Sequence, residues 1–339
     1  MLTLPLMPLP GMSGSDEFGD IARRFAPLSF GSPEALGLRD DAALIGGRPG
    51  YDLVISQDTV VEGVHFVERE RADRIALKLL RSNLSDLAAK GAEPYGCFLA
   101  ISWPAHYDTA ARDLFAAALK GDLAHFGMAL FGGDTTATPG PLTASLTVLG
   151  WVKAGSMVKR AGAKVGDAIV VSGTIGDAYL GLKLAQGDDL GLSKKDQAFL
   201  LDRFHCPQPR LSLRQALLSH AHAAADVSDG LLADCGHVAA VNALGSIVQL
   251  ETLPLSPAAQ NWLERQADRA RAVASLATGG DDYEIVCAVA PDEIEAMMHA
   301  AVPSQVPLTI VGRMAKDSGQ SVTWNANAVS IGSRGFQHV

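Results

Sequence analysis

Segments with the hydrophobic pattern of strands alternate with segments of helical periodicity along both halves of this sequence. In the first half, we predict helices at 16–28, 72–90 and 108–127, and strands at 51–61, 95–103, 128–133 and 141–152. In the second half, we predict helices at 176–187, 194–204, 208–222, 229–244 and 291–300, and strands at 168–173, 246–250, 281–289 and 307–312, with a terminal hairpin. This alternation restricts the chain to an α/β or α+β architecture.

A polar stretch with spaced glycines, at 153–167, separates the two halves. The chain has 339 residues, which is enough to bury two ordinary cores. We therefore predict two domains of α/β type. The N-terminal domain would span 1–152 and the C-terminal domain 153–339.

Charge and cysteine usage exclude several classes of protein. The formal net charge of −9 argues against a nucleic-acid surface. The four cysteines include no C-x-x-C pair, which argues against a zinc site. The apolar stretch at 1–12 is short, interrupted by prolines and without a basic flank, so we expect neither a signal peptide nor a membrane span. These features lead us to expect a cytoplasmic protein.

Aspartates recur where predicted strands end, and each one alone could simply cap a helix or fill a turn. Asp58 follows a β-branched strand, and Asp226 and Asp229 follow another apolar run, at the strand ends where α/β proteins gather ligands. Asp86 lies inside a predicted helix, where capping cannot explain it. Converging carboxylates would repel one another unless cations lay between them. Oxygen ligands without His or Cys favour Mg²⁺.

The stretch "MALFGGDTTATPG" (128–140) combines a strand with a glycine pair, a setting in which proteins bind phosphate. Asp134 follows the glycines, and a carboxylate can border a phosphate if Mg²⁺ bridges the two. P-loop, protein-kinase and dinucleotide-binding motifs are all missing from the sequence. Lys159, Arg160 and Lys164 could steady a nucleotide phosphate, or could be no more than a solvated linker. The pattern indicates a Mg²⁺-dependent phosphate enzyme and leaves transfer and hydrolysis both open.

Several strings together resemble the thiamine-monophosphate kinase family, part of the PurM-like superfamily. They occur in the family's order from about Glu17 to Phe336: "DEFGDIARRF", "DDAAL", "DTVVEGVHF", "NLSDLAAKGAEP", "GGDTT", "VKRAGAKVGD", "SGTIGDAYLGL", "DVSDGLLADCGH" and "GGDDYE". The resemblance implies a two-domain PurM-like fold and a homodimer formed through the N-terminal domains. It also implies ATP-dependent phosphorylation of thiamine monophosphate to thiamine diphosphate, by direct in-line transfer assisted by several Mg²⁺ ions.

The resemblance also assigns site residues at matching positions. Those implied for metal binding are Asp41, Ser56, Gln57, Asp58, Asp86, Asp134, Asp226 and Asp229. Those implied for ATP binding are Gly133, Asp134, Arg160 and Ser228, and those for the thiamine phosphate are His65, Asp281 and Phe336. We expect Asp58, Asp134 and Arg160 to be the central catalytic residues. His65 could instead pack beside its apolar neighbours.

Three positions depart from the family pattern. Gln57 stands where threonine is usual, which would not matter if the ligand were a backbone carbonyl. Asp281 replaces the commoner glutamate and is shorter by one methylene. Phe336 replaces tryptophan or tyrosine, so an aromatic face remains but its polar group is lost.

The implied reaction fits the lack of a histidine-based catalytic pair. A phosphate monoester has a second pKa near ~6, so the attacking oxygen is already anionic at neutral pH and needs no general base. The difficulty is to bring two polyanions together, and positioning with charge neutralisation addresses it.

Other functions remain as alternatives. A selenophosphate synthetase usually has a reactive Cys or selenocysteine near its N-terminus, and no cysteine precedes Cys97 here. A carbamoyl-dehydrating maturation protein of the superfamily ends in a cysteine, whereas this chain ends in "GFQHV". A metal-dependent phosphohydrolase would release phosphate from ATP without an acceptor. A non-catalytic nucleotide-binding protein would bind ATP and turn nothing over.

Overall fold

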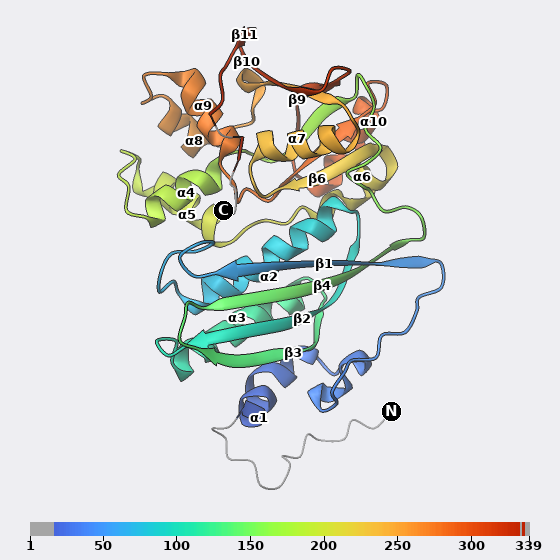
Figure 1. Cartoon of the computed structure of the whole chain (residues 1–339), viewed down its shortest axis with the longest axis vertical. Coiled ribbons are helices and arrows are strands. Elements are labelled where there is room, and N and C mark those ends of the chain that lie inside the picture. Colours follow the sequence, from blue (N-terminus) through green and yellow to red (C-terminus); the bar gives the residue numbers. More distant parts are fainter. Residues whose placement is uncertain (1–16, 333, 336–339) are drawn as a thin grey trace.

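The computed structural model describes residues 17–332 and 334–335, and its strands form two separate sheets (Figure 1). Each sheet has its own hydrophobic core, one built from residues up to Val152 and one from residues after it. The predicted α/β architecture with two sheet-containing halves is confirmed. Among the described residues, no helix has both the length and the apolarity needed to cross a membrane.

The N-terminal half contains a four-stranded sheet in the order β1-β4-β2-β3. Its strands are β1 (Tyr51–Val61), β2 (Glu93–Pro104), β3 (Ala129–Thr138) and β4 (Thr143–Lys153). Helices α2 (Ala72–Ala89) and α3 (Thr109–His125) pack against one face of this sheet (Figure 1). Preceding them, α1 (Glu17–Asp20) continues into a π-helical turn (Ile21–Phe25) and two 3₁₀ segments (Ala26–Ser29 and Pro33–Leu38), which lie along β3.

The C-terminal half contains a seven-stranded mixed sheet in the order β11-β10-β7-β9-β5-β8-β6. Its strands are β5 (Ala168–Ser172), β6 (Ala221–Val227), β7 (Gly245–Gln249), β8 (Glu284–Val289), β9 (Leu308–Ala315), β10 (Gly319–Trp324) and β11 (Asn327–Ala328). Its helices are α4 (Asp177–Ala185), α5 (Lys194–His205), α6 (Arg214–His220), α7 (Leu231–Val241), α8 (Pro257–Leu263), α9 (Arg269–Thr278) and α10 (Ile294–Ala301). Side chains of α7 and α9 share a core with one face of the sheet, and those of α6 and α10 with the other.

Three local predictions were wrong. The strand predicted at 128–133 does not end at its glycine pair, because β3 continues through Gly132–Gly133 to Thr138. The region 208–222 is not one helix, since α6 ends at His220 and the chain then enters β6. Helices α8 and α9 were not predicted at all.

Helix α2 connects the two halves of the molecule (Figure 1). It packs on β1 and β4 of its own sheet, and also contacts β6 and β8 of the other. Its last residues, Ala88 and Ala89, belong to the core formed with α6 and β8. Any polar group on the side of α2 that faces the C-terminal half therefore lies between the two domains.

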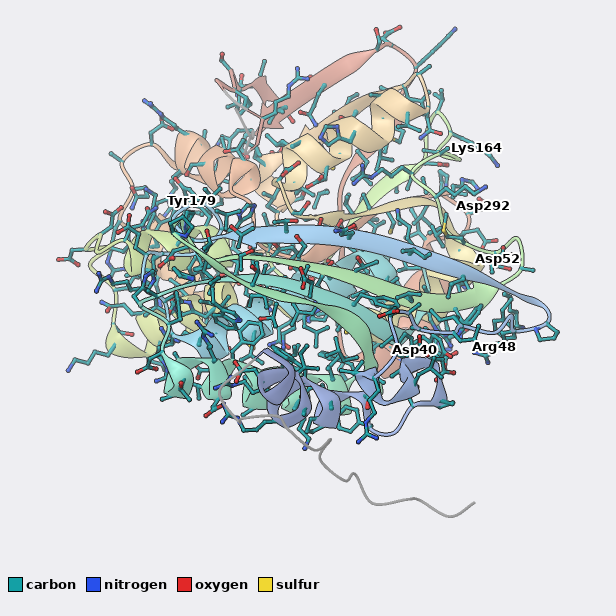
Figure 2. All side chains as sticks on the ribbon, turned by 60° about the horizontal axis from the view of Figure 1, so that its bottom comes forward. Asp40, Arg48, Asp52, Lys164, Tyr179 and Asp292 are labelled. Atoms are coloured by element: carbon teal, nitrogen blue, oxygen red, sulfur yellow. The ribbon has the colours of Figure 1, made fainter. Side chains whose placement is uncertain are left out.

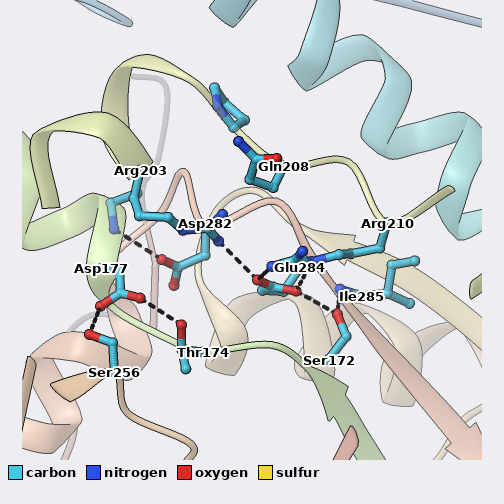
Figure 3. A network of polar contacts seen from close by, with 12 residues as sticks. Ser172, Thr174, Asp177, Arg203, Gln208, Arg210, Ser256, Asp282, Glu284 and Ile285 are labelled. Atoms are coloured by element: carbon cyan, nitrogen blue, oxygen red, sulfur yellow. Dashed lines mark hydrogen bonds and ion pairs between the residues drawn. The ribbon is translucent and has the colours of Figure 1, made fainter. Parts of the chain in front are cut away.

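A buried ionic network anchors the start of β8 (Figure 3). Glu284 is fully buried and bonds to two arginines, with Arg203 Nη2 at 2.9 Å and Arg210 Nε at 2.6 Å. Ser172 is a third partner, and its hydroxyl donates to Glu284 Oε2 at 2.6 Å. Next to this network, Asp282 accepts the backbone N–H groups of Gly176 and Ala178. The buried carboxylates of Asp282 and Glu284 thus hold the end of the loop and the start of β8 in place.

We expect Glu284→Gln to lower the free energy of unfolding by about 3–5 kcal/mol, because two buried guanidinium groups would lose their counter-charge. Urea denaturation of wild type and variant measures the difference. Glu293→Gln is the matched control: Glu293 is about half exposed and pairs with His220, so its loss should cost less than about 1 kcal/mol. Equal losses in the two variants would contradict a structural role for the network.

Candidate active site

Strand β1 and helix α2 together present oxygen ligands in the space between the domains. Asp58 pairs across the sheet with Leu146, and Ser56 pairs with Val148, so both face the side of the sheet that α2 covers. The Ser56 hydroxyl donates to Asp86 on α2. The Asn83 side chain accepts the Asp58 N–H at 3.0 Å, which fixes the backbone at this position.

The C-terminal half supplies the opposing carboxylates. Asp226 is the next-to-last residue of β6 and is buried, and Asp229 lies in the loop between β6 and α7. Asp234, on the first turn of α7, accepts the N–H groups of Ser228 and Asp229 at 3.1 and 3.2 Å. Ligand atoms of Asp229, Asp234 and His237 lie within 4.8 Å of one another.

Mutual repulsion is visible in the titration of these groups. Loss of hydration among the surrounding protein atoms, and then the charges of Asp86 and Asp229, raise the pKa of Asp58 to about 6. Burial, followed by the charge of Asp229, raises the pKa of Asp234 to about 7. Burial, with Asp86 next, raises the pKa of Asp226 well above its ordinary value. Even without a bound ligand, the charges of these carboxylates act on one another, so they form one electrostatic cluster.

The donor set of this carboxylate cluster fits Mg²⁺. It offers carboxylate and hydroxyl oxygens from both domains, which hard divalent cations prefer. Without a cation, burial and mutual repulsion favour the protonated forms of these carboxyls, whereas a bound cation would favour the ionised forms. The cluster formed by Ser56, Asp58, Asp86, Asp226 and Asp229 could therefore hold metal ions between the domains.

A cavity of about 490 Å³ opens beside the carboxylates. Asp58, Asp229, Ser228, His65 and Asp281 all line it, and the other lining residues are Gln57, Thr59, Val60, Val61, Val64, Ser82, Tyr179, Leu182, Gly280 and Tyr283. The His65 ring Nδ1 accepts the Val61 N–H at 3.1 Å, so this half-buried ring is held by the backbone while it borders the cavity. The cavity joins the residues expected for metal, nucleotide and acceptor.

Cations border the cluster on the side of the 153–167 segment. Arg160 is exposed and lies close enough to act electrostatically on Asp234 and on Lys90. Lys90, at the end of α2, donates to the Ala224 carbonyl at 2.8 Å, and burial lowers its pKa. The Ala224 N–H in turn donates to the Lys159 carbonyl at 3.0 Å. Lys90 and Ala224 therefore link α2 and β6 to the basic segment 153–167, which contains Lys159, Arg160 and Lys164.

Within one chain, Asp134 and Gly133 lie away from the carboxylate cluster. Through the strand pairings, Asp134 aligns with Ala100, Ser145 and Thr59, on the sheet face opposite to α2. It sits on β3 at the far edge from β1, roughly 14 Å away at three strand spacings. Gly133 has φ +152°, and a Cβ there would lie 1.8 Å from the Leu99 carbonyl oxygen, so only glycine fits.

Asp41 also lies apart from the carboxylate cluster. It is exposed in the segment that follows the 3₁₀ turn Pro33–Leu38, and that turn packs against β3. Figure 2 shows its neighbour Asp40 well away from Tyr179, which lines the cavity. The expected site residues thus do not all meet within one chain: Gly133 and Asp134 lie on β3, Asp41 lies in the segment before β1, and the other described ones line the cavity or border the carboxylates. Phe336 lies outside the described residues.

Several residues of the site were not found from the sequence. Asn83, Tyr283 and Lys90 all contact or border the carboxylates. Asp234 belongs to the aspartates that recur in the sequence, but the sequence assigned it no role. One signal was available: Ser82, Asp86 and Lys90 continue from Lys78 at intervals of four, which places all of them on one face of a helix.

The raised pKa of Asp58 gives a stability prediction. Between about pH 4, where the unfolded carboxyl loses its proton, and about pH 6, the metal-free folded protein retains a proton at Asp58, so its stability falls over this range and stays at the lower level above it. Asp58→Asn should therefore raise the melting temperature of metal-free protein at about pH 7.5 and change it little at about pH 4.5.

Excess Mg²⁺ should reverse the order at about pH 7.5, because the wild-type carboxylate gains a cation that the amide binds poorly. Asp292→Asn, at an exposed position, is the control and should show neither effect. Thermal unfolding with and without chelator measures both. A variant less stable than wild type in chelator at about pH 7.5 would contradict the repulsion.

Comparisons with known proteins agree with this architecture. The family model for the AIR synthase related protein N-terminal domain matches residues 39–152, and that for the C-terminal domain matches residues 164–325. A thiamine-monophosphate kinase from Caulobacter vibrioides is 49% identical over 97% of this chain and 92% of its own length.

Solved structures show the same fold. A thiamine-monophosphate kinase from Stenotrophomonas maltophilia, 39% identical, superposes with a TM-score of 0.80 over 92% of this chain and 98% of the other. A structure described as AaThiL complexed with AMPPCP and TMP has a TM-score of 0.76 over 87% and 89% of the two chains; at 23% identity it shows the fold alone. Together, the sequence and domain matches show that the chain belongs to the thiamine-monophosphate kinase family, on the two-domain fold of AIR synthase related proteins.

Proposed function

We propose that this chain phosphorylates thiamine monophosphate to thiamine diphosphate with ATP, by direct in-line transfer and with several Mg²⁺ ions held by its aspartates. Family membership supports the reaction, since relatives of high coverage carry this activity as their name. The observation that carries the mechanism is the carboxylate cluster of both domains beside one cavity. Such a cluster suits phosphoryl transfer, in which neutralising and positioning phosphates is the main catalytic task.

Each group at the cavity has a role in this proposal. Ser56, Asp58, Asp86, Asp226 and Asp229 would hold the ions, with Gln57 contributing at the cavity edge. Bound Mg²⁺ supplies charge that offsets the phosphates and links them to the protein. The chain's own oxygens fix where that charge lies, since Asp58 and Asp86 are held by Asn83 and Ser56.

The remaining residues would position the two substrates. Arg160 and Ser228 lie on the side of the basic segment and of β6, where they would contact the nucleotide. His65 and Asp281 line the cavity, where they would contact the thiamine phosphate. The acceptor phosphate is already anionic, so no group has to remove a proton from it.

We also propose that the protein is a homodimer whose sites are shared. Gly133 and Asp134 lie on β3, and Asp41 lies in the exposed segment before β1, whereas the carboxylate cluster lies between α2 and the C-terminal half, so one chain does not bring these groups to the same phosphates. The sheet face opposite to α2 carries small and apolar side chains, including Ile55 at 60% exposure. With a two-fold axis parallel to the strands, pairing of this face would place β3 of each chain over β1 of its partner, whose Gln57 and Thr59 line the cavity.

A cytoplasmic location is part of the proposal. All four cysteines are free, and Cys97, Cys235 and Cys287 are buried, as expected in a reducing compartment.

The direct test is ³¹P NMR of the protein with ATP, Mg²⁺ and thiamine monophosphate. We expect a diphosphate signal on thiamine, one ADP for each product, and no turnover without Mg²⁺. Phosphate release at the same rate with or without thiamine monophosphate would instead establish a phosphohydrolase.

Shared sites predict complementation between two inactive variants. Asp58→Asn and Asp134→Asn should each lower turnover by about 100-fold or more, because each removes a charge that faces the phosphates. A heterodimer of the two variants, purified through two different tags, should recover about half of the wild-type turnover, since one composite site is intact.

The control places both substitutions in one chain of the heterodimer, opposite a wild-type chain. Shared sites leave no intact site in this control, whereas sites built within one chain would leave one. Activity in the control and none in the first heterodimer would overturn the shared-site proposal.

A further inference from the structure

Lys78 is a buried cation at the acceptor end of the cavity. It lies on α2 with a side chain 3% exposed, and its Nζ is 2.9 Å from Asp281 Oδ2. The same Nζ lies 3.8 Å from the centroid of the Phe204 ring on α5. The ion pair crosses between the domains, because α2 belongs to the N-terminal half and Asp281 to the C-terminal half.

The backbone around Asp281 is fixed in an unusual conformation. Asp281 has φ +71° and Tyr283 has φ +50°, in the left-handed region that side chains other than glycine seldom adopt. The Asp281 N–H donates to the Ser228 carbonyl at 2.9 Å, and the Tyr283 N–H to the Val227 carbonyl at 2.8 Å. A Cβ at Gly280 would lie 2.5 Å from the Ser228 carbonyl oxygen. Strain of this kind persists where the surroundings fix a functional loop.

Both oxygens of the Asp281 carboxylate have a donor from the protein. Lys78 bonds to Oδ2, and the Tyr283 hydroxyl donates to Oδ1 at 3.2 Å. Burial, followed by the charge of Asp281, raises the pKa of the Tyr283 phenol, so this hydroxyl stays a donor at neutral pH. Each carboxylate oxygen keeps a second lone pair with which it can accept from a ligand in the cavity.

We propose that Lys78 is a positioning residue of the acceptor site, which together with Tyr283 holds the Asp281 carboxylate ready to bind the amino-bearing, cationic ring system of the acceptor. The inference rests on the proposed function and deepens it. Asp281 shares its cavity with Asp58 and Asp229, whose negative charges would otherwise disfavour a third carboxylate there. Lys78 supplies the counter-charge from beneath the cavity without occupying its lining.

A second, partly buried cation of α2 provides a matched control. Arg81 forms a paired contact with Asp122 of α3, at 2.6 and 2.9 Å, and its Nη1 donates to the Pro207 carbonyl at 3.2 Å. Arg81 does not line the cavity. Loss of Lys78 and loss of Arg81 should therefore both affect stability, but only the loss of Lys78 should affect the acceptor.

The experiment compares Lys78→Met with Arg81→Met in steady-state kinetics with ATP, Mg²⁺ and thiamine monophosphate. Methionine keeps an apolar stem against Phe204 and removes the charge. Lys78→Met should raise KM for thiamine monophosphate by about 10- to 100-fold with KM for ATP unchanged, and Arg81→Met should leave both KM values unchanged. Tyr283→Phe provides a second variant, with a smaller rise in the same KM, if Lys78→Met folds poorly.

A double-mutant cycle decides whether Lys78 acts through Asp281. In the Asp281→Ala background, Lys78→Met should raise KM for thiamine monophosphate no further. An equal rise in both backgrounds, an unchanged KM in Lys78→Met and Tyr283→Phe, or a parallel rise in KM for ATP would each overturn the inference. Wild-type protein in the same assay separates this outcome from failure of the proposed function, which would show as no thiamine diphosphate from wild type.

Discussion

Repulsion between carboxylates at the junction of two domains is the constraint on which the rest of this site depends. Asp58, Asp86, Asp226, Asp229 and Asp234 approach one another from both sheets, and three of them have raised pKa values. Folding alone would avoid such an arrangement, because each ionised group opposes the others. The arrangement becomes favourable when cations bind, because their positive charge offsets both the carboxylates and the phosphates.

Helix α2 meets this constraint by carrying both signs of charge on one face. Lys78, Ser82, Asp86 and Lys90 follow one another at intervals of one helical turn along the domain junction. Asp86 lies between the two lysines, one of which bonds to Asp281 and the other to the Ala224 carbonyl. In the proposed reaction, the helix that joins the two cores would therefore also set the spacing between the acceptor end and the nucleotide end of the site.

The sequence predicted those features that depend on local pattern. Asp86 could be singled out because a helix interior gives an aspartate no capping role, and the helix itself ends within a residue of its predicted end. The continuation of β3 through Gly132–Gly133 could not be predicted, because glycines weaken a strand, and the close approach of the Leu99 backbone to Gly133 is a non-local contact. The separation of Asp134 from Asp58 was equally hidden, since it follows from strand order and register, which are non-local.

The expected ligands of the phosphates lie at both edges of the N-terminal sheet, near β1 and on β3. This separation offers a reason why transfer of the phosphoryl group to the acceptor would be faster than its transfer to water. A protomer alone presents the carboxylate cluster on an open cavity, where a bound nucleotide would meet water on one side. In the proposed dimer, the residues of β3, including Asp134 on the face opposite to α2, would come from a second copy that covers this opening. Pairing would then complete the ligand set and exclude water in one step, while the Lys78–Asp281 pair holds the acceptor end in register. Selection of a phosphate acceptor over water is, on this argument, a property of the assembled dimer.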